Sequence, residues 1–451
     1  MNPLCGACTL PVQSPFLFVA KITMDILVIG SGGREHALAW KAAQGKDIGT
    51  VYVASGNGGT ASDTQLENIQ IGADDFSALA DFAVKKSIGL TIVGPEAPLV
   101  DGIVDYFRER DLPIFGPSKG AAQLEGSKAF TKDFLARNNI PSGAYQSFTE
   151  VEPALAYLQE MGAPIVIKAD GLAAGKGVIV AMELAEAEAA VEDMLAGNAF
   201  GEAGHRVVIE EFLEGEEASF IVMVDGENVL PMATSQDHKR VGDGDTGPNT
   251  GGMGAYSPAP VVTDVIYQRI MDEVIMPTVR GMAAEGNEYT GFLYAGLMID
   301  AEGTPKVIEY NCRFGDPETQ PIMLRLRSDL VDLCLAALDK KLATTTAQWD
   351  ERKSVGIVIA AGGYPASYEK GAVISGLMSE EPDLKVFHAG TQQSGNGDIL
   401  SNGGRVLCVT ALGDSIGEAQ QRAYQATQKI SWKDSFYRKD IGWRAIAREQ
   451  G

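Results

Sequence analysis

From Met24 onward, short β-rich runs alternate with amphipathic stretches, and this alternation limits the possible folds more than any other feature of the chain. The predicted elements, in chain order, are a strand at 26–29, a helix at 35–44, a strand at 51–54, a helix at 76–86 and a strand at 90–93. Strands separated by helices pair in parallel, because each helix carries the chain back to the same end of the sheet. The sequence therefore predicts an α/β fold that begins with a parallel sheet.

Glycine-rich turns follow these strands at 30–33, 56–59 and 94–95. The carboxyl ends of parallel strands are where open sheets bind ligands, and glycine lets the backbone approach a ligand closely. The first turn opens a helix, but Glu35 stands where the dinucleotide fingerprint needs its third glycine. This turn therefore predicts a site for phosphate or another anion, with plain turn chemistry as the alternative.

Two further regions follow the first. The second has helical patterns at 119–138, 151–161, 183–196, 264–285 and 328–337, and strand patterns at 165–168, 178–180, 207–211, 292–299 and 306–311. A long loop at 235–254 holds no predicted core strand, and loops of that length are usually functional. After the polar stretch 344–353, the chain is β-rich, with strands at 355–360, 385–388 and 406–410 and a helix at 415–430.

The charge balance argues against nucleic acid as a partner. The chain of 451 residues has 37 Lys and Arg against 60 Asp and Glu, a net charge of -23. A surface that acidic repels a phosphate backbone. No run of about 18 apolar residues occurs, so no membrane span is expected.

The cysteines and the first 23 residues carry further expectations. Five scattered cysteines are not the framework of a small secreted domain, and they fit a reducing cytoplasm. Cys5 and Cys8 form a CxxC, but no strand and helix pattern surrounds them, which indicates a chance spacing. Residues 1–23 contain prolines and no hydrophobic period, so we expect a disordered extension or an artefact of an upstream start site.

The segment Gly171-Leu172-Ala173-Ala174-Gly175-Lys176-Gly177 resembles a P-loop but is one residue short between its glycines. It also has Gly177 where Ser or Thr would bind magnesium, so it is not a Walker A motif. Because it lies between two predicted strands, it predicts a flexible hairpin that could fold over phosphates. Lys168 ends the first strand and could reach the same anion, while a plain hairpin is the alternative.

Glu309 and Asn311 end a predicted strand and point to one face, because side chains alternate along a strand. Two hard oxygen donors suit a magnesium ion that shares its other positions with phosphates and water. The acidic stretch 210–217, taken alone, predicts an exposed loop. Residues 243–254 do not match a calcium loop, because Gly254 stands where the closing glutamate belongs. No histidine spacing indicates zinc.

A strand, a glycine hairpin with a lysine, an acidic hinge and a Glu-x-Asn strand, in this order, resemble the ATP-grasp superfamily. Within it, four segments resemble the phosphoribosylamine–glycine ligase family, and the likeness is close to its bacterial monofunctional form. The segments are 32–37 (GGREHA), 94–99 (GPEAPL), 247–254 (GPNTGGMG) and 311–320 (NCRFGDPETQ). The resemblance runs from Met24 to Gly451.

This resemblance implies a fold of three parts. An N-terminal α/β domain of the pre-ATP-grasp kind would span 24–123, and a two-lobed ATP-grasp domain would span 124–345. The small lobe of that domain, at about 145–210, would be a mobile lid. A β-rich C-terminal domain would span 346–451.

The resemblance also implies a cytoplasmic enzyme of purine synthesis that joins glycine to 5-phosphoribosylamine. ATP would phosphorylate glycine, and the amine would then attack the acyl phosphate. The implied cofactor is Mg²⁺, or Mn²⁺ in its place, with ATP as co-substrate. For the oligomeric state we expect a monomer, with a weak dimer as the alternative.

The same resemblance carries site residues onto this sequence. Those implied to bind ATP are Lys128, Lys168, Gly171, Gly175, Lys176, Gly177, Glu210, Glu211, Leu213 and Glu217. Those implied to bind glycine and phosphoribosylamine are Gly32, Gly33, Arg34, Asn57, Thr60, Glu96, Asp237, Lys239, Asn249, Gly251, Gly252, Arg313 and Asp316. Lys168, Arg313 and Asp316 are implied to be catalytic, and Glu309 and Asn311 to be metal ligands. Gly296 stands where many relatives supply another carboxylate, which leaves a second metal ion open.

Two other functions are weighed against this one. The first is a different ATP-grasp enzyme of purine synthesis, such as a carboxylase of aminoimidazole ribonucleotide, but the segments 247–254 and 313–320 argue against it. The second is a regulatory protein that binds a nucleotide without turnover. ADP release in the presence of both substrates separates the ligase from that regulatory protein.

Overall fold

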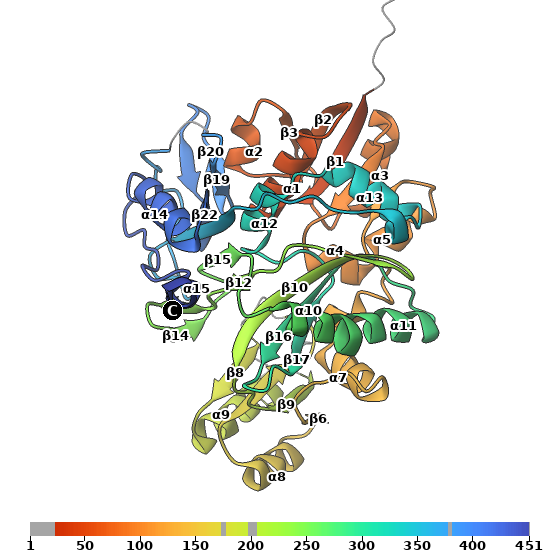
Figure 1. Cartoon of the computed structure of the whole chain (residues 1–451), viewed down its shortest axis with the longest axis vertical. Coiled ribbons are helices and arrows are strands. Elements are labelled where there is room, and N and C mark those ends of the chain that lie inside the picture. Colours follow the sequence, from red (N-terminus) through yellow and green to blue (C-terminus); the bar gives the residue numbers. More distant parts are fainter. Residues whose placement is uncertain (1–22, 173–176, 197–204, 378–380, 451) are drawn as a thin grey trace, which may run out of the picture.

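The computed structural model describes residues 23–172, 177–196, 205–377 and 381–450. Figure 1 shows a parallel sheet and a β-rich C-terminal sheet side by side at the top, a long twisted sheet in the middle and a small sheet with two helices at the bottom. The predictions for residues 1–22, including the cysteine pair, and for Gly175 and Lys176 lie outside the described residues. None of the described helices has the length and apolar character needed to cross a membrane.

The N-terminal sheet is fully parallel and has the strand order β3-β2-β1-β4-β5. Its strands are β1 (Met24–Gly30), β2 (Ile48–Ser55), β3 (Leu66–Ile69), β4 (Leu90–Val93) and β5 (Ile114–Phe115). Helices α1 (Gly33–Ala43), α2 (Gly58–Ser62) and α3 (Phe76–Lys86) connect them. The predicted parallel α/β sheet is confirmed. Strand β3 was missed because it is short and half polar.

A small antiparallel sheet with the order β6-β9-β7-β8, which we call the small lobe, has its own core. Its strands are β6 (Tyr145–Phe148), β7 (Ile165–Ala169), β8 (Val178–Ala181) and β9 (Val207–Glu211). Helices α8 (Val151–Met161) and α9 (Leu184–Leu195) pack on it. Strands β7 and β8 pair in antiparallel fashion, as predicted for the two strands of the hairpin, whereas residues 173–176 at its tip lie outside the described residues.

The central sheet is antiparallel, with the order β11-β10-β16-β17. Its strands are β10 (Glu216–Asp225), β11 (Val229–Pro231), β16 (Thr290–Ile299) and β17 (Pro305–Asn311). The helix predicted at 264–285 consists of α10 (Asp264–Arg269), a π-helical turn η2 (Ile270–Ile275) and α11 (Met276–Ala284). Pro277 explains the wide turn, because proline has no N–H to donate and its ring displaces the carbonyl of the preceding turn.

The helix predicted at 119–138 is interrupted. It forms α6 (Gln123–Gly126) and α7 (Lys128–Arg137), with Ser127 in an extended conformation between them. The Ser127 hydroxyl accepts a hydrogen bond from the N–H of Phe130 at 3.1 Å, as an N-cap does. This break directs the start of α7, and with it Lys128, toward the small lobe.

The C-terminal sheet has the order β12-β15-β18-β22-β19 and takes two strands from the middle of the chain. Its strands are β12 (Gln236–Asp237), β15 (Gly254–Ser257), β18 (Lys353–Ala360), β19 (Leu384–His388) and β22 (Arg405–Gly413), and helix α14 (Ile416–Thr427) packs on it. The prediction of no core strand at 235–254 is therefore wrong. Strands β12 and β15 were missed because they are only two and four residues long, and glycines precede β15.

Candidate functional site

Two buried lysines share the carboxylate of Glu210, at the end of β9. Nζ of Lys168, on β7, lies 3.0 Å from Oε1, and Nζ of Lys132, on α7, lies 3.2 Å from Oε2. Lys168 also donates to the carbonyl oxygen of Ile308 in β17 at 2.9 Å, so it links the small lobe to the central sheet. Glu210 is only 5% exposed, so an exposed loop is the wrong interpretation at this residue.

Lys128 lies beside the start of the hairpin, and its ammonium donates to the carbonyl oxygen of Gly171. Burial lowers the pKa of Lys128. Gly171 has a φ of +91°, a conformation that favours glycine. Lys132, one turn further along α7, was not predicted, because no sequence signal separates a buried lysine from a solvated one on an amphipathic helix. The structure therefore adds Lys132 to the predicted cluster of lysines.

Glu309 and Asn311 both end β17 and are half-buried. Nζ of Lys239 lies 3.1 Å from Oε1 of Glu309 and also contacts the carboxylate of Glu217. Neighbouring lysine charges, Lys239 first, outweigh burial and lower the pKa of Glu309 to about 2. The Glu309 side chain is therefore an ionised carboxylate at neutral pH.

These groups fit a divalent cation that takes its other ligands from phosphate and water. An ionised carboxylate and an amide oxygen are hard donors, and no described residue hydrogen-bonds the Asn311 side chain. Gly296 pairs with Glu309 across β16 and β17 and offers no carboxylate. In the described ranges, no group of three or more His, Cys, Asp or Glu side chains could hold a metal ion. The pair therefore suits a cation that is also held by a nucleotide.

The hinge after β9 carries the other residues expected to bind ATP. Glu211 is fixed to Ala144, whose carbonyl oxygen accepts from the Glu211 N–H at 2.8 Å and whose N–H donates to the Glu211 carboxylate at 3.0 Å. Leu213 lies against Gly143, and Glu217, the second residue of β10, contacts Lys239. These residues lie from the end of β9 to the start of β10, where the chain passes from the small lobe to the central sheet.

An ionic network joins the first domain to the segment after β17. Nη2 of Arg313 lies 2.8 Å from Oε1 of Glu125, and its Nε lies 3.3 Å from Oε2 of Glu96. Arg34 lies 4.0 Å from Glu96 and 2.6 Å from Glu35. Burial opposes ionisation of Glu96, but Arg313 and Arg34 lower its pKa to about 2. Glu125 was not predicted, because a glutamate on a short helix has no distinguishing pattern.

Asn57 and Thr60 are buried and use their side chains within the chain. The Asn57 amide nitrogen donates to the carbonyl oxygens of Ser31 at 2.9 Å and His388 at 2.8 Å. Its oxygen accepts from the N–H of Thr60 at 3.1 Å, and the Thr60 hydroxyl accepts from the N–H of Asn57 at 2.7 Å. Any contact of these side chains with substrate would have to replace such bonds. They therefore hold the two glycine turns together.

His388 comes from the C-terminal domain and was not expected near the site loops. The backbone N–H of His388 donates to the ring Nδ1 of His36, on α1, at 2.9 Å. Burial first, then neighbouring positive charge, lowers the pKa of both histidines, that of His388 to about 4. The C-terminal domain therefore contacts the first two glycine turns. The sequence does not predict this contact, because the residues are more than 300 positions apart.

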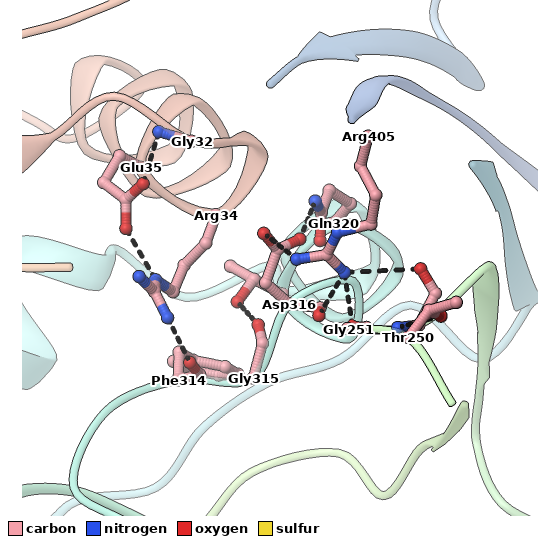
Figure 2. A network of polar contacts seen from close by, with 12 residues as sticks. Gly32, Arg34, Glu35, Thr250, Gly251, Phe314, Gly315, Asp316, Gln320 and Arg405 are labelled. Atoms are coloured by element: carbon pink, nitrogen blue, oxygen red, sulfur yellow. Dashed lines mark hydrogen bonds and ion pairs between the residues drawn. The ribbon is translucent and has the colours of Figure 1, made fainter. Parts of the chain in front are cut away.

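Figure 2 shows Asp316 between the first glycine turn and the loop that holds Gly251. The Asp316 carboxylate accepts from Nε2 of Gln320 at 2.8 Å and lies 2.9 Å from Nη2 of Arg405. A Cβ atom added to Gly32 or Gly33 would lie 3.9 or 3.8 Å from the Asp316 carboxylate. The structure therefore brings Gly32, Gly33, Asp316 and Gly251 to one region.

The remaining predicted residues lie on the same loop. Asp237, in β12, is near Gly252, whose added Cβ would lie 3.4 Å from Oδ2 of Asp237. Burial, and then the charge of Glu318, raises the pKa of Asp237 well above its usual range. Asn249 pairs with Arg240 in the ribbon β13 (Arg240–Gly242) and β14 (Thr246–Asn249). Asn249 therefore lies at the edge of the loop, outside the Asp316 network.

Comparison with known families matches three consecutive parts of the chain. Residues 24–125 match the N domain of phosphoribosylglycinamide synthetase, residues 126–319 its ATP-grasp (A) domain and residues 354–444 its C domain.

Two curated relatives match over 428 residues, which are 95% of this chain and the full length of each relative. Phosphoribosylamine–glycine ligase from Vibrio parahaemolyticus is 73% identical, and that from Escherichia coli strain K12 is 72% identical. A crystal structure of phosphoribosylamine–glycine ligase from Thermotoga maritima is 33% identical, with a TM-score of 0.80, and covers 93% of this chain and 100% of its own. A biotin carboxylase domain from Hydrogenobacter thermophilus, 16% identical with a TM-score of 0.69 over 92% of each chain, shares the fold.

Proposed function

The chain belongs to the phosphoribosylglycinamide synthetase family, and on that premise we propose that it joins glycine to 5-phosphoribosylamine with cleavage of ATP to ADP and phosphate. The observation that carries this proposal is that the chain holds two sets of site residues, one suited to a nucleotide and one suited to small polar substrates. Lys128, Lys168 and Glu210 suit a nucleotide, and the loops around Asp316 suit two small polar substrates. The chain is thus a carbon–nitrogen ligase. Its reaction needs the nucleotide site and the substrate site next to each other.

The first step transfers the γ-phosphoryl group of ATP to the glycine carboxylate, because a free carboxylate is a poor acyl donor. The product is glycyl phosphate, and ADP leaves. Such a transfer requires neutralised charge and aligned reactants more than a covalent nucleophile. Lys128 and Lys168 supply positive charge where phosphates would lie, and Lys239 approaches the same place from the 235–254 loop.

The second step forms the amide. The neutral amine of phosphoribosylamine attacks the glycyl carbonyl, the carbon–oxygen bond to phosphate breaks, and the proton lost by the nitrogen passes to the leaving phosphate or to solvent. Arg313 and Asp316 hold opposite charges near the acyl group, and Glu96 and Arg34 place the amine from the first domain. Residues of the hairpin after Lys168 would exclude water from the acyl phosphate.

We assign the metal to Glu309 and Asn311, with Mg²⁺ as the ion and Mn²⁺ as the alternative. The ion would supply positive charge to the phosphates of ATP. The ammonium of Lys239 contacts the carboxylates of both Glu217 and Glu309. It therefore neutralises part of their negative charge, so a second metal ion is not needed for that purpose. We therefore infer that one divalent ion, with two protein ligands, is sufficient here.

We place the enzyme in the cytoplasm and expect a monomer. Cys312, Cys334 and Cys408 are buried and free, which fits a reducing compartment.

ADP release by the purified chain tests this function. The assay contains ATP, Mg²⁺ and glycine, with or without phosphoribosylamine formed in place from ribose 5-phosphate and ammonia. We expect release that requires both glycine and the amine. Release with another carboxylate or another nucleotide instead would overturn the substrates, and ATP binding without release under any condition would overturn the ligase.

A further inference from the structure

Arg405 begins β22 in the C-terminal domain, and its guanidinium lies between two loops of the central domain (Figure 2). Nη2 lies 2.9 Å from Oδ2 of Asp316. Nη1 donates to the carbonyl oxygens of Asp316 at 2.6 Å and Gly252 at 3.3 Å, and it also contacts that of Gly251. Arg405 therefore connects two loops. One is the turn at 313–318 after β17, which holds Asp316 and which we call the acidic turn, and the other is the glycine-rich end of the 235–254 loop.

Protein groups occupy three of the five N–H donors of this guanidinium, on both of its Nη atoms. The two hydrogens of Nη1 already face three carbonyl oxygens, and Nη2 faces a carboxylate. The side chain is 20% exposed. Arg405 therefore holds groups of two loops at once, which requires a planar fork of donors.

The loop is shaped to accept the guanidinium. A Cβ atom on Gly251 would lie 3.0 Å from Cζ of Arg405 and 3.1 Å from its Nη2. The N–H of Gly251 donates to the hydroxyl of Tyr364, also from the C-terminal domain, at 3.2 Å. Gly252 has a φ of +108°, and an added Cβ would lie 2.4 Å from Cδ of Pro317. The C-terminal domain therefore holds this turn against the acidic turn.

Asp316 is held on its other side by the central domain. Its Oδ1 accepts from Gln320 at 2.8 Å, while Oδ2 faces Arg405. Burial opposes its ionisation, but the charges of Arg405 and then Arg34 lower the pKa of Asp316. Asp316 is therefore an oriented anion beside Gly32 and Gly33.

We propose that Arg405 is a positioning residue of the ligase reaction, which fixes Asp316 and the Gly251-Gly252 turn relative to each other. Through it the C-terminal domain sets the geometry of the glycine and phosphoribosylamine sites. The identity of these substrates rests on the proposed function. Lys128, Lys168 and Glu210 make no contact with Arg405, so ATP binding is independent of it.

The first test replaces Arg405 with Lys, which keeps the charge but cannot reach both loops. We expect KM for glycine or phosphoribosylamine to rise about tenfold or more, because small misplacements of reactants are costly. KM for ATP should stay unchanged. The matched control is Arg422→Lys, an arginine of the same domain that donates to the carbonyl oxygen of Leu412 at 2.8 Å and lies 3.8 Å from Asp383, away from the site.

A second variant approaches the same contact from the other side. Gly251→Ala should displace the guanidinium from the turn by a few tenths of an ångström, and because Gly251 is exposed and has no positive φ, the variant should fold normally. We expect a rise in KM for glycine or phosphoribosylamine that is smaller than that of Arg405→Lys. In a double-mutant cycle with Arg405→Lys, the effects should be less than additive, since both changes break one contact.

The outcomes separate this inference from the proposed function. An inactive wild-type protein would overturn the function. An active wild type with Arg405→Lys kinetics equal to those of Arg422→Lys would overturn the role of Arg405. A rise in KM for ATP of the same size, or additive effects of Arg405→Lys and Gly251→Ala, would also overturn it. Thermal midpoints matched to the control, with a selective rise in KM, would support it.

Discussion

The small lobe and the C-terminal domain both border the site, but they are attached to the rest of the molecule in different ways. The small lobe has a separate core that contains only residues of its own sheet and helices. The C-terminal sheet includes β12 and β15 from the central segment, and Val358, Phe387 and Cys408 belong to a core shared with the first domain. In Figure 1 the small lobe lies at the bottom, and the C-terminal domain lies beside the first domain at the top.

This difference indicates different tasks. A unit with its own core can move as a rigid body, because few apolar contacts must be broken. A domain that shares strands and core residues cannot shift without unfolding part of its neighbour. Arg448 also forms a two-pronged ion pair with Glu216 of β10, at 2.6 and 2.7 Å. We therefore propose that the small lobe is a lid over ATP, whereas the C-terminal domain is a fixed wall of the substrate site.

The sharpest test of this comparison removes core volume from each region. Leu158→Ala in the small lobe and Ile357→Ala in β18 both truncate side chains with no exposure, which costs about 2–5 kcal/mol each. We expect faster hydrogen exchange only in small-lobe peptides for Leu158→Ala. For Ile357→Ala, exchange should also rise in the peptide with Gly254, its partner across β15 and β18. Exchange that spreads equally from both sites would refute the distinction.

The next test concerns charge at the ATP site, contributed by both the small lobe and the central sheet. Lys168→Met and Glu309→Gln should each lower turnover by about 10²-fold or more, the usual effect of losing one group that stabilises developing charge. Steady-state ADP release measures both. Lys168→Met should in addition loosen the small lobe, because Lys168 bonds to Ile308 of β17.

Each of these variants has a control in the same part of the fold. Arg206→Met removes a half-exposed small-lobe cation that lies 3.7 Å from Asp170. Glu302→Gln changes an exposed acid in the turn between β16 and β17. Both controls should keep near-normal turnover. If Lys168→Met or Glu309→Gln behaved like its control, the assigned role of that residue would be wrong.

The smallest expected effect is the pH dependence of the contact between the first and C-terminal domains. Burial, then Lys385, lowers the pKa of His388 from 6.5 to about 4. Between pH 6.5 and about 4, the folded state therefore binds fewer protons than the unfolded state. The contribution of neutral, buried His388 to the free energy of unfolding is complete above pH 6.5 and decreases as the pH falls toward 4. The slope is at most about 1.4 kcal/mol per pH unit.

Thermal midpoints between pH 7.5 and 5 check this expectation. His388→Asn should make the midpoint less sensitive to pH, whereas His205→Asn, at an exposed histidine, should leave the slope unchanged. The comparison uses the slope rather than the midpoint itself, because Asn also loses the contact of His388 with Thr391. An unchanged slope in His388→Asn would show that this histidine is not buried in its neutral form.

Local patterns were sufficient for much of this molecule. The parallel sheet, the hairpin after Lys168 and the Glu309-x-Asn311 strand all follow from hydrophobic periodicity and from glycine at strand ends, which act over a few residues. The motif segments also identified the family before any contact was known. Such features could be predicted because each depends on neighbours in the chain.

The tertiary structure alone decided which distant groups meet. Lys132 pairs with Glu210 and Glu125 with Arg313 across long stretches of chain, and neither residue stands out in its own segment. Strand β15 is recognisable only beside β18, and Arg405 only beside Asp316. A buried charge is stable only with its partner, and the partner's position is a property of the folded chain, so the sequence by itself determined the chemistry available and the fold decided where it is used.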